Sequence, residues 1–148
     1  MNDEDKMLRA IELAKQAYSL DEVPIGAVIF HGDEIVGEGY NLKEFSGNPM
    51  SHAEMIAIEQ AAKNLGRWRL FDCELFVTLE PCPMCAGAIV NSRLDRVVFG
   101  ANDQKAGACE TLYAIPQDDR LNHRAEVVGG VLKEECIALL QSFFKAKR

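Results

Sequence analysis

The sequence predicts an α/β domain, in which strands and helices alternate along the chain. A strand pattern at residues 73–79 is followed by a helical pattern at 83–92 and a short strand at 96–100. This order implies crossover connections and parallel pairing. Earlier in the chain, strand patterns at 25–30 and 35–40 flank a turn and predict an antiparallel hairpin. We therefore expect a sheet that mixes both kinds of pairing.

Each further element follows from a local pattern. Apolar residues at three- and four-residue spacing predict amphipathic helices at both ends of the chain and before the third strand. Ser51 is the expected N-cap of that internal helix, and Gly66 is its expected stop. In order, these elements are a helix at 3–19, a loop at 41–51, a helix at 52–65, a polar loop at 101–110, a helical turn at 111–115 ended by Pro116, a strand at 125–131 and a helix at 132–146.

The whole chain, residues 1–148, is expected to form a single domain. Its hydrophobic content of 48% and charged content of 26% are those of a soluble globular protein. No apolar run approaches the roughly 20 residues of a membrane helix, and the acidic start lacks the layout of a signal peptide. Five cysteines, an odd number, indicate reduced thiols, so we expect a cytoplasmic protein with no membrane partner.

The net charge of −7 argues against a general nucleic-acid binder, because such proteins are usually basic. RNA binding needs only a local basic surface, however, and the chain has enough basic residues to form one. The alternative is that these residues are scattered, solvated charges. The candidates are Arg67, Arg69, Lys105, Arg120, Arg124 and the tail from Lys145 to Arg148.

The least accidental spacing in the chain lies around Cys82 and Cys85. Pro83 suits the first turn of a helix, and two cysteines at i and i+3 on that helix point their sulfurs the same way. A helix N-terminus favours the thiolate, which is the form that binds a metal. His52, at the start of the preceding helix, is the best third ligand. Three protein ligands are typical of catalytic zinc, because the fourth position stays open for water.

Glu54 lies two residues after His52, where it can move protons instead of coordinating the metal. Its alternative role is that of a first-turn carboxylate that interacts favourably with the helix dipole. A lone Cys-x-x-Cys motif is a weak signal. A His-x-Glu motif followed by Pro-Cys-x-x-Cys is a strong one, and this combination favours the catalytic interpretation.

These motifs resemble the established signature of the zinc-dependent cytidine and adenosine deaminases. Beyond the motifs, nearly the whole chain is similar to one branch of that family, the bacterial tRNA-specific adenosine deaminases. The segments that support this similarity are residues 23–28, Asn41, 52–54, 68–70, 77–82, 96–101, 122–124 and 143–144.

The resemblance implies a three-layer α/β/α fold of the cytidine-deaminase type around a central mixed five-stranded sheet. It also implies one Zn2+ per subunit, held by His52, Cys82 and Cys85, with Glu54 as the catalytic residue. The implied reaction is hydrolytic deamination of adenosine to inosine at the wobble position of a tRNA anticodon, by zinc-activated hydroxide. The implied partners are the anticodon stem-loop of tRNA and a second copy of the chain in a homodimer.

The same resemblance assigns contacts to the substrate. It implies that Asn41 hydrogen-bonds the extruded base, that Ala53 offers backbone contacts and that Asp103 lies near the ribose. The residues implied to build the apolar wall on which the base packs are Pro24, Ile25 and Val28.

Four other positions bear on the function. Glu110 places a bulky acid in a loop that, by resemblance, edges the substrate channel, where its carboxylate would repel phosphate and affect the substrate range. By resemblance, His123 is structural and not a fourth metal ligand. Phe143 and Phe144 are either core residues beside a solvated tail or, by resemblance to the tRNA-editing branch, part of an RNA contact.

Two alternatives to tRNA editing stay open. The first is a deaminase of a free base, nucleoside or nucleotide, of the cytosine, guanine or cytidine type, with the same metal ligands. The acidic net charge favours this alternative. The second is a non-catalytic zinc or RNA-binding module. Glu54 argues against it, because a structural site needs no such acid and usually has four protein ligands.

Overall fold

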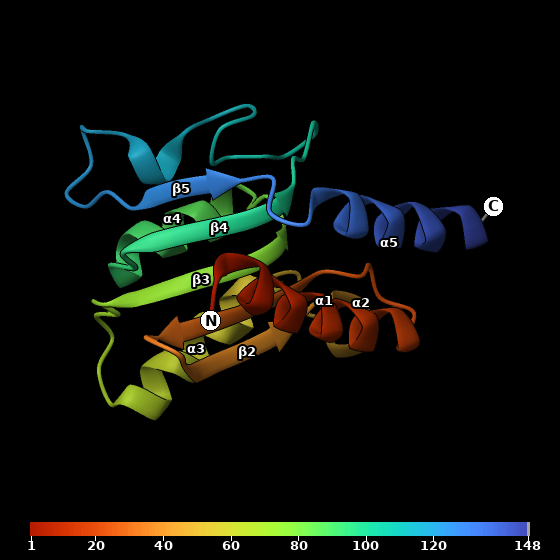
Figure 1. Cartoon of the computed structure of the whole chain (residues 1–148), viewed down its shortest axis with the longest axis horizontal. Coiled ribbons are helices and arrows are strands. Elements are labelled where there is room, and N and C mark those ends of the chain that lie inside the picture. The colour runs from red at the N-terminus through yellow and green to blue at the C-terminus, as the bar shows by residue number, and fades with distance from the viewer. Residues whose placement is uncertain (148) are drawn as a thin grey trace.

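The sheet at the centre of the structure has five strands in the order β2-β1-β3-β4-β5 (Figure 1). In this computed structural model, which describes residues 1–147, β1 pairs antiparallel with β2 and β3, whereas β3–β4 and β4–β5 are parallel. The predicted mixed five-stranded sheet is confirmed. Arg148, the end of the predicted basic tail, lies outside the described residues. The strands are β1 Gly26–His31, β2 Glu34–Tyr40, β3 Cys73–Leu79, β4 Arg96–Ala101 and β5 Glu126–Gly129.

Helices cover both faces of this sheet, as the three-layer prediction requires. Alternate residues of β1 enter two separate hydrophobic clusters. Ala27 and Ile29 pack with residues of α3 and α4, whereas Val28 and Phe30 pack with residues of α1 and α5. Figure 1 shows α1 in front of the sheet and α3 and α4 behind it. The four long helices are α1 Asp3–Ser19, α3 Ala53–Leu65, α4 Pro83–Ser92 and α5 Lys133–Ala146.

Glycines let two helices approach the β1–β2 hairpin closely. A Cβ atom on Gly26 would collide with the carbonyl oxygen of Ala10 in α1 and lie 2.5 Å from the Ala14 nitrogen. Gly37 and Gly39 of β2 face α3 in the same way, with no room for a side chain. The backbones therefore pack against each other directly, which fixes α1 and α3 relative to the sheet.

The structure corrects two predictions in the segment before α3. Residues 41–51 are not entirely a loop, because Lys43–Ser46 forms the short helix α2. Four residues are too few to give a periodic pattern. The N-cap of α3 is His52 and not Ser51, since His52 is the last residue with extended backbone angles before the helix.

Two predictions near the C-terminal end are also corrected. The helical turn expected at 111–115 lies later, as the 3-10 helix η1 Ile115–Gln117, because proline is tolerated in the first turn of a helix. β5 ends at Gly129, before the expected residue 131, where Gly130 adopts a φ of 89° and redirects the chain. Among residues 1–147, no helix is both long enough and apolar enough to cross a membrane.

We expect Gly26→Ala to lower the free energy of unfolding by about 1–3 kcal/mol, because the added methyl group overpacks the contact between β1 and α1. Urea denaturation followed by circular dichroism measures this change. Gly87→Ala in α4 is the matched control, since a Cβ atom there meets no atom within 4 Å. The control should be neutral or stabilising by about 0.5–1 kcal/mol. Equal stabilities of the two variants would contradict the close approach.

Candidate metal centre and substrate pocket

The candidate site forms where two helices begin at the same edge of the sheet. β2 and β3 both run antiparallel to β1, so their C-terminal ends lie at one edge. α3 follows β2 and α4 follows β3, which brings the two helix starts together. His52 is the N-cap of α3 and Cys82 is the N-cap of α4, and neither side chain caps its own helix. Both side chains are therefore free to serve the site.

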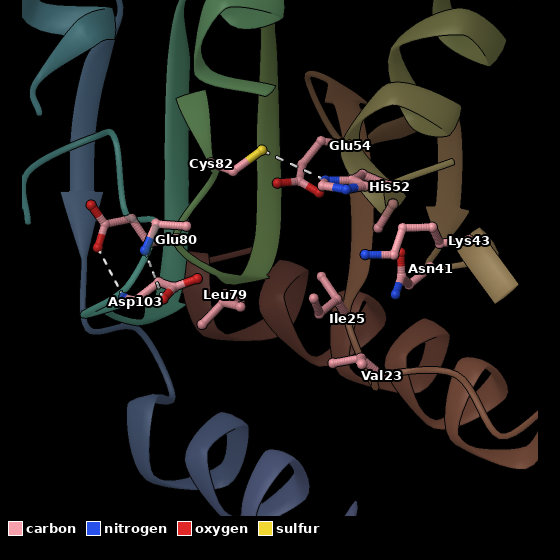
Figure 2. Close-up of a pocket in the computed structure, with 12 residues that line it drawn as sticks. Val23, Ile25, Asn41, Lys43, His52, Glu54, Leu79, Glu80, Cys82 and Asp103 are labelled. Carbon is pink, nitrogen blue, oxygen red and sulfur yellow. Dashed lines mark hydrogen bonds between the residues drawn. The ribbon is translucent and has the colours of Figure 1, made fainter. Parts of the chain in front are cut away.

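His52, Cys82 and Cys85 come together in a cluster that can hold a metal ion. His52 Nδ1 lies 3.6 Å from the Sγ atom of each cysteine, and the three atoms lie within 4.8 Å of one another. Figure 2 shows Cys82 directed toward the His52 ring. Nitrogen at 2.0–2.1 Å and sulfur at 2.3 Å from a tetrahedral zinc ion are themselves about 3.6 Å apart. The spacing thus fits a tetrahedral cation.

Hydrogen bonds within the cluster favour a thiolate at Cys82. The bond with Cys85, assisted by the bond with His52, lowers the pKa of Cys82 to about 4. The same pairing raises the pKa of Cys85, which keeps its proton. The hydrogen bond with Cys82 also raises the pKa of His52. A divalent cation would replace these shared protons, because coordinated thiols are deprotonated.

Glu54 lies in the first turn of α3, beside the cluster, and its side chain is only 4% exposed. Burial is the largest cause that raises the pKa of this carboxyl to about 7, and the charge of Cys82 adds to the effect. A carboxyl with a pKa near neutrality can both accept and donate a proton. Buried carboxyls of this kind are concentrated at functional sites.

A pocket of about 590 Å³, including its open mouth, lies directly against the cluster. The residues at its wall come from β3, from the starts of α3 and α4, and from the segments beside β1, β2 and β4. Residues predicted for the site that line this pocket are Ile25, Asn41, His52, Ala53, Glu54, Cys82 and Asp103.

Comparisons with known proteins identify the family. The sequence profile of the MafB19-like deaminase family matches residues 1–148. A tRNA-specific adenosine deaminase of Bacillus subtilis is 52% identical over 146 residues, which cover 99% of this chain and 91% of that protein. The chain belongs to the tRNA-specific adenosine deaminase family. A second member, from Haemophilus influenzae, is 48% identical over 99% of this chain and 85% of its own length.

Solved structures place the fold in the same group. A tRNA:A34 deaminase, studied for A-to-I editing at the wobble position of transfer RNA, has a TM-score of 0.86 at 36% identity. That match covers 90% of this chain and 97% of the other. A guanine deaminase from Bacillus subtilis has a TM-score of 0.66 at 35% identity, over 76% of this chain and 82% of the other. The predicted cytidine-deaminase-like fold is thereby confirmed.

Two of the six substrate contacts predicted from the tRNA-specific adenosine deaminase family lie away from the pocket. The prediction for Val28 is wrong, because alternate strand residues face opposite sides of a sheet and Val28 packs beneath α1. Pro24 is buried before β1 and is not among the residues that line the pocket. The apolar wall consists instead of Ile25 together with Val23 and Leu79.

Sequence analysis missed two charged residues at the pocket, Lys43 and Glu80. Lys43 belongs to α2, the helix that was too short to predict. Glu80 is only 2% exposed. Although burial alone would raise its pKa, hydrogen bonds from Thr111 and from backbone N–H groups lower the pKa of Glu80 to about 2. An acid between an apolar strand and a Cys-x-x-Cys motif is the signal that could have revealed it.

His123 and Glu110 both interact within loops. His123 donates its Nε2–H to the Leu94 carbonyl oxygen at 2.7 Å, which agrees with the structural role expected for it. Glu110 accepts a 2.9 Å hydrogen bond from Asn102 and is not among the residues that line the pocket. Its carboxylate, expected at the channel edge, is therefore bound by its own loop.

We expect Cys85→Ala to abolish stoichiometric metal binding, because two remaining ligands hold a divalent cation far more weakly than three. Loss of the bound metal should also lower the free energy of unfolding by about 3 kcal/mol or more, since binding to the native state stabilises it. Elemental analysis and thermal unfolding measure the two effects. Cys73→Ala, which removes a buried thiol outside the cluster, is the control and should keep its metal. A metal-replete Cys85→Ala protein would refute the ligand assignment.

Proposed function

We propose that this protein converts adenosine to inosine by hydrolytic deamination at the wobble position of a tRNA anticodon. The observation that supports this most directly is the buried Glu54 beside a His-Cys-Cys cluster at the wall of a pocket. Relatives named tRNA-specific adenosine deaminase, at 45–52% identity over nearly the full chain, support the choice of substrate.

We infer that His52, Cys82 and Cys85 hold one Zn2+ per subunit. Imidazole and thiolate ligands suit zinc, and their 3.6 Å spacing fits its coordination geometry. When bound, zinc supplies hydroxide at neutral pH by lowering the pKa of its water. Within residues 1–147, the cluster contains three candidate ligands and not four, which favours a catalytic over a structural site.

Glu54 handles the protons of the reaction. Hydrolysis at C6 forms a bond from water oxygen to carbon and breaks the bond to the exocyclic nitrogen, so adenosine and water become inosine and ammonia. Glu54 takes one proton from the attacking water and passes it to ring N1, and then moves the second proton, from the new hydroxyl on C6, to the leaving amine. Burial raises the pKa of this carboxyl to about 7, so near neutral pH it can readily gain or lose a proton.

The pocket wall orients the extruded nucleoside. Ile25 provides an apolar face for the base, Asn41 provides a hydrogen-bonding amide and Ala53 offers its backbone. Asp103 Oδ1 accepts hydrogen bonds from two N–H groups of its own loop, at 3.0 and 3.2 Å, which leaves the second oxygen for a ribose hydroxyl. An unpaired loop nucleotide fits this site, because it can be extruded at less cost than a paired one.

A groove beside the pocket offers a surface for RNA. Lys105 and Lys145 line this groove, together with Phe144, between α5 and the loop after β4. Phe144 is 48% exposed and can stack on a base, whereas Phe143 is 6% exposed and belongs to the core. Local positive charge with an exposed aromatic ring is compatible with RNA binding despite the net charge of −7.

We further propose that the protein works as a homodimer in the cytoplasm, where tRNA is processed. Leu112 and Tyr113, next to the loop that edges the pocket, are 52% and 59% exposed. A second copy that covers such apolar side chains would remove them from water. Light scattering should then give a mass of about twice the 16.4 kDa of the chain.

Deamination of a free base is the second candidate. The similarity to a solved guanine deaminase at 35% identity favours it, as does the acidic net charge. The decisive experiment compares inosine formation in an anticodon stem-loop with wobble adenosine against turnover of free adenosine, cytidine and guanine. Inosine in the RNA alone would establish tRNA editing. Turnover of guanine with inert RNA would replace it by the second candidate.

We expect Glu54→Gln to keep its metal and to lose about 10²–10⁴-fold in kcat, because the amide cannot exchange protons with water and substrate. Single-turnover assays on the stem-loop, with metal content measured in parallel, check this outcome. Glu59→Gln, an exposed position on the same helix, is the matched control and should keep full activity. Near-normal turnover by Glu54→Gln would remove this residue from the mechanism.

A further inference from the structure

We propose that Glu80 is a positioning residue for catalysis: it holds residues 102–111, the pocket loop, in the conformation that presents Asp103 to the substrate. This inference rests on the proposed function. Glu80 follows β3 directly, and the pocket loop follows β4, its parallel neighbour. Both segments therefore leave the sheet at the same edge, next to the candidate metal centre.

The carboxylate of Glu80 is surrounded by donors from this one loop. Its Oε2 accepts backbone N–H bonds from Cys109, Glu110 and Thr111 at 3.1, 2.9 and 2.9 Å. Its Oε1 accepts the Asp103 N–H at 3.1 Å and the Asn102 side-chain amide at 3.3 Å, and also the Thr111 hydroxyl. All six donors are neutral groups. The negative charge of Glu80 is therefore stabilised by hydrogen bonds from the loop and not by an ion pair with a basic residue.

The loop is shaped to wrap around this one side chain. A Cβ atom on Gly107 would collide with Glu80 Oε1 and lie 2.5 Å from the Asp103 carbonyl oxygen. Backbone bonds reinforce the arrangement, since the Ala108 N–H bonds to the Pro81 oxygen at 2.9 Å and the Glu80 N–H bonds to the Ala101 oxygen at 2.8 Å. A glycine at position 107 lets the loop close over the carboxylate.

The link from Glu80 to the substrate runs through Asp103. The Asp103 N–H binds Glu80 while its side chain lines the pocket, so the carboxylate sets where this side chain stands. Asp103 is placed to contact the nucleoside before and during the reaction. A contact of this kind stabilises the bound substrate and the transition state equally. Its loss therefore raises KM and leaves kcat nearly unchanged. Substitution of a residue needed only for folding would not raise KM while leaving kcat unchanged.

The test replaces Glu80 by glutamine, whose amide presents N–H donors where the loop also presents N–H donors. For the substrate that the wild-type protein turns over, we expect Glu80→Gln to raise KM on the order of tenfold while kcat stays within about threefold. Thr111→Val, which removes one donor and keeps the shape, should raise KM less. Gln104→Ala, an exposed loop residue outside the network, is the control and should change neither constant.

A double-mutant cycle identifies the route. Asp103→Ala should raise KM in the wild-type background but add little to Glu80→Gln, because both changes remove the same contact. Amide hydrogen exchange at residues 103 and 109–111 should accelerate in Glu80→Gln, with the metal content unchanged. This exchange readout needs no substrate, so it stays informative if the stem-loop proves inert. Additive effects of the two substitutions, loss of metal, or unchanged exchange would each overturn the proposal.

Discussion

The meeting of two helix N-termini at one edge of the sheet is the constraint on which the site depends. An N-cap side chain normally accepts a hydrogen bond from its own helix, and losing such a cap costs about 1 kcal/mol. In α3 and α4 the N-cap positions are His52 and Cys82, whose side chains face each other instead. The N–H groups and the dipoles at the two helix starts then favour negative charge at the cluster, where the Cys82 thiolate lies.

The two faces of the sheet have different tasks. Behind the sheet, α3 and α4 bring the ligands and Glu54 to the edge of the pocket. In front of it, α1 packs on β1 so closely that Gly26 has no room for a side chain. This contact keeps β1 from shifting, and β1 separates β2 from β3 in the sheet. The distance between the two helix starts is therefore set by a strand that contributes no ligand.

Much of the fold and the central cluster could be predicted, because each depends on a pattern in the sequence. Periodicity located the long helices and the strands, and the spacing of His52, Cys82 and Cys85 identified the cluster. Val28 was misplaced because resemblance ignores which side of a strand a residue faces. Lys43 and Glu80 were missed for another reason. Lys43 lies in a very short helix, and Glu80 is held by hydrogen bonds from the backbone of a loop. Neither feature produces a periodic pattern in the sequence.

The position of Glu80 in the chain links the loop that forms one wall of the pocket to the candidate metal ligand Cys82. Only Pro81, whose φ angle is fixed by its ring, separates the anchor of the pocket loop from the ligand Cys82. Three consecutive residues directly after β3, Glu80 to Cys82, therefore contain both the anchor of the loop that presents Asp103 and a candidate metal ligand. A variant selected for a new substrate is free to change Ile25 or Asn41 on the opposite wall, whereas changes at residues 102–111 must preserve the hydrogen-bond donors that surround Glu80. The two walls of one pocket thus differ in how freely they can evolve.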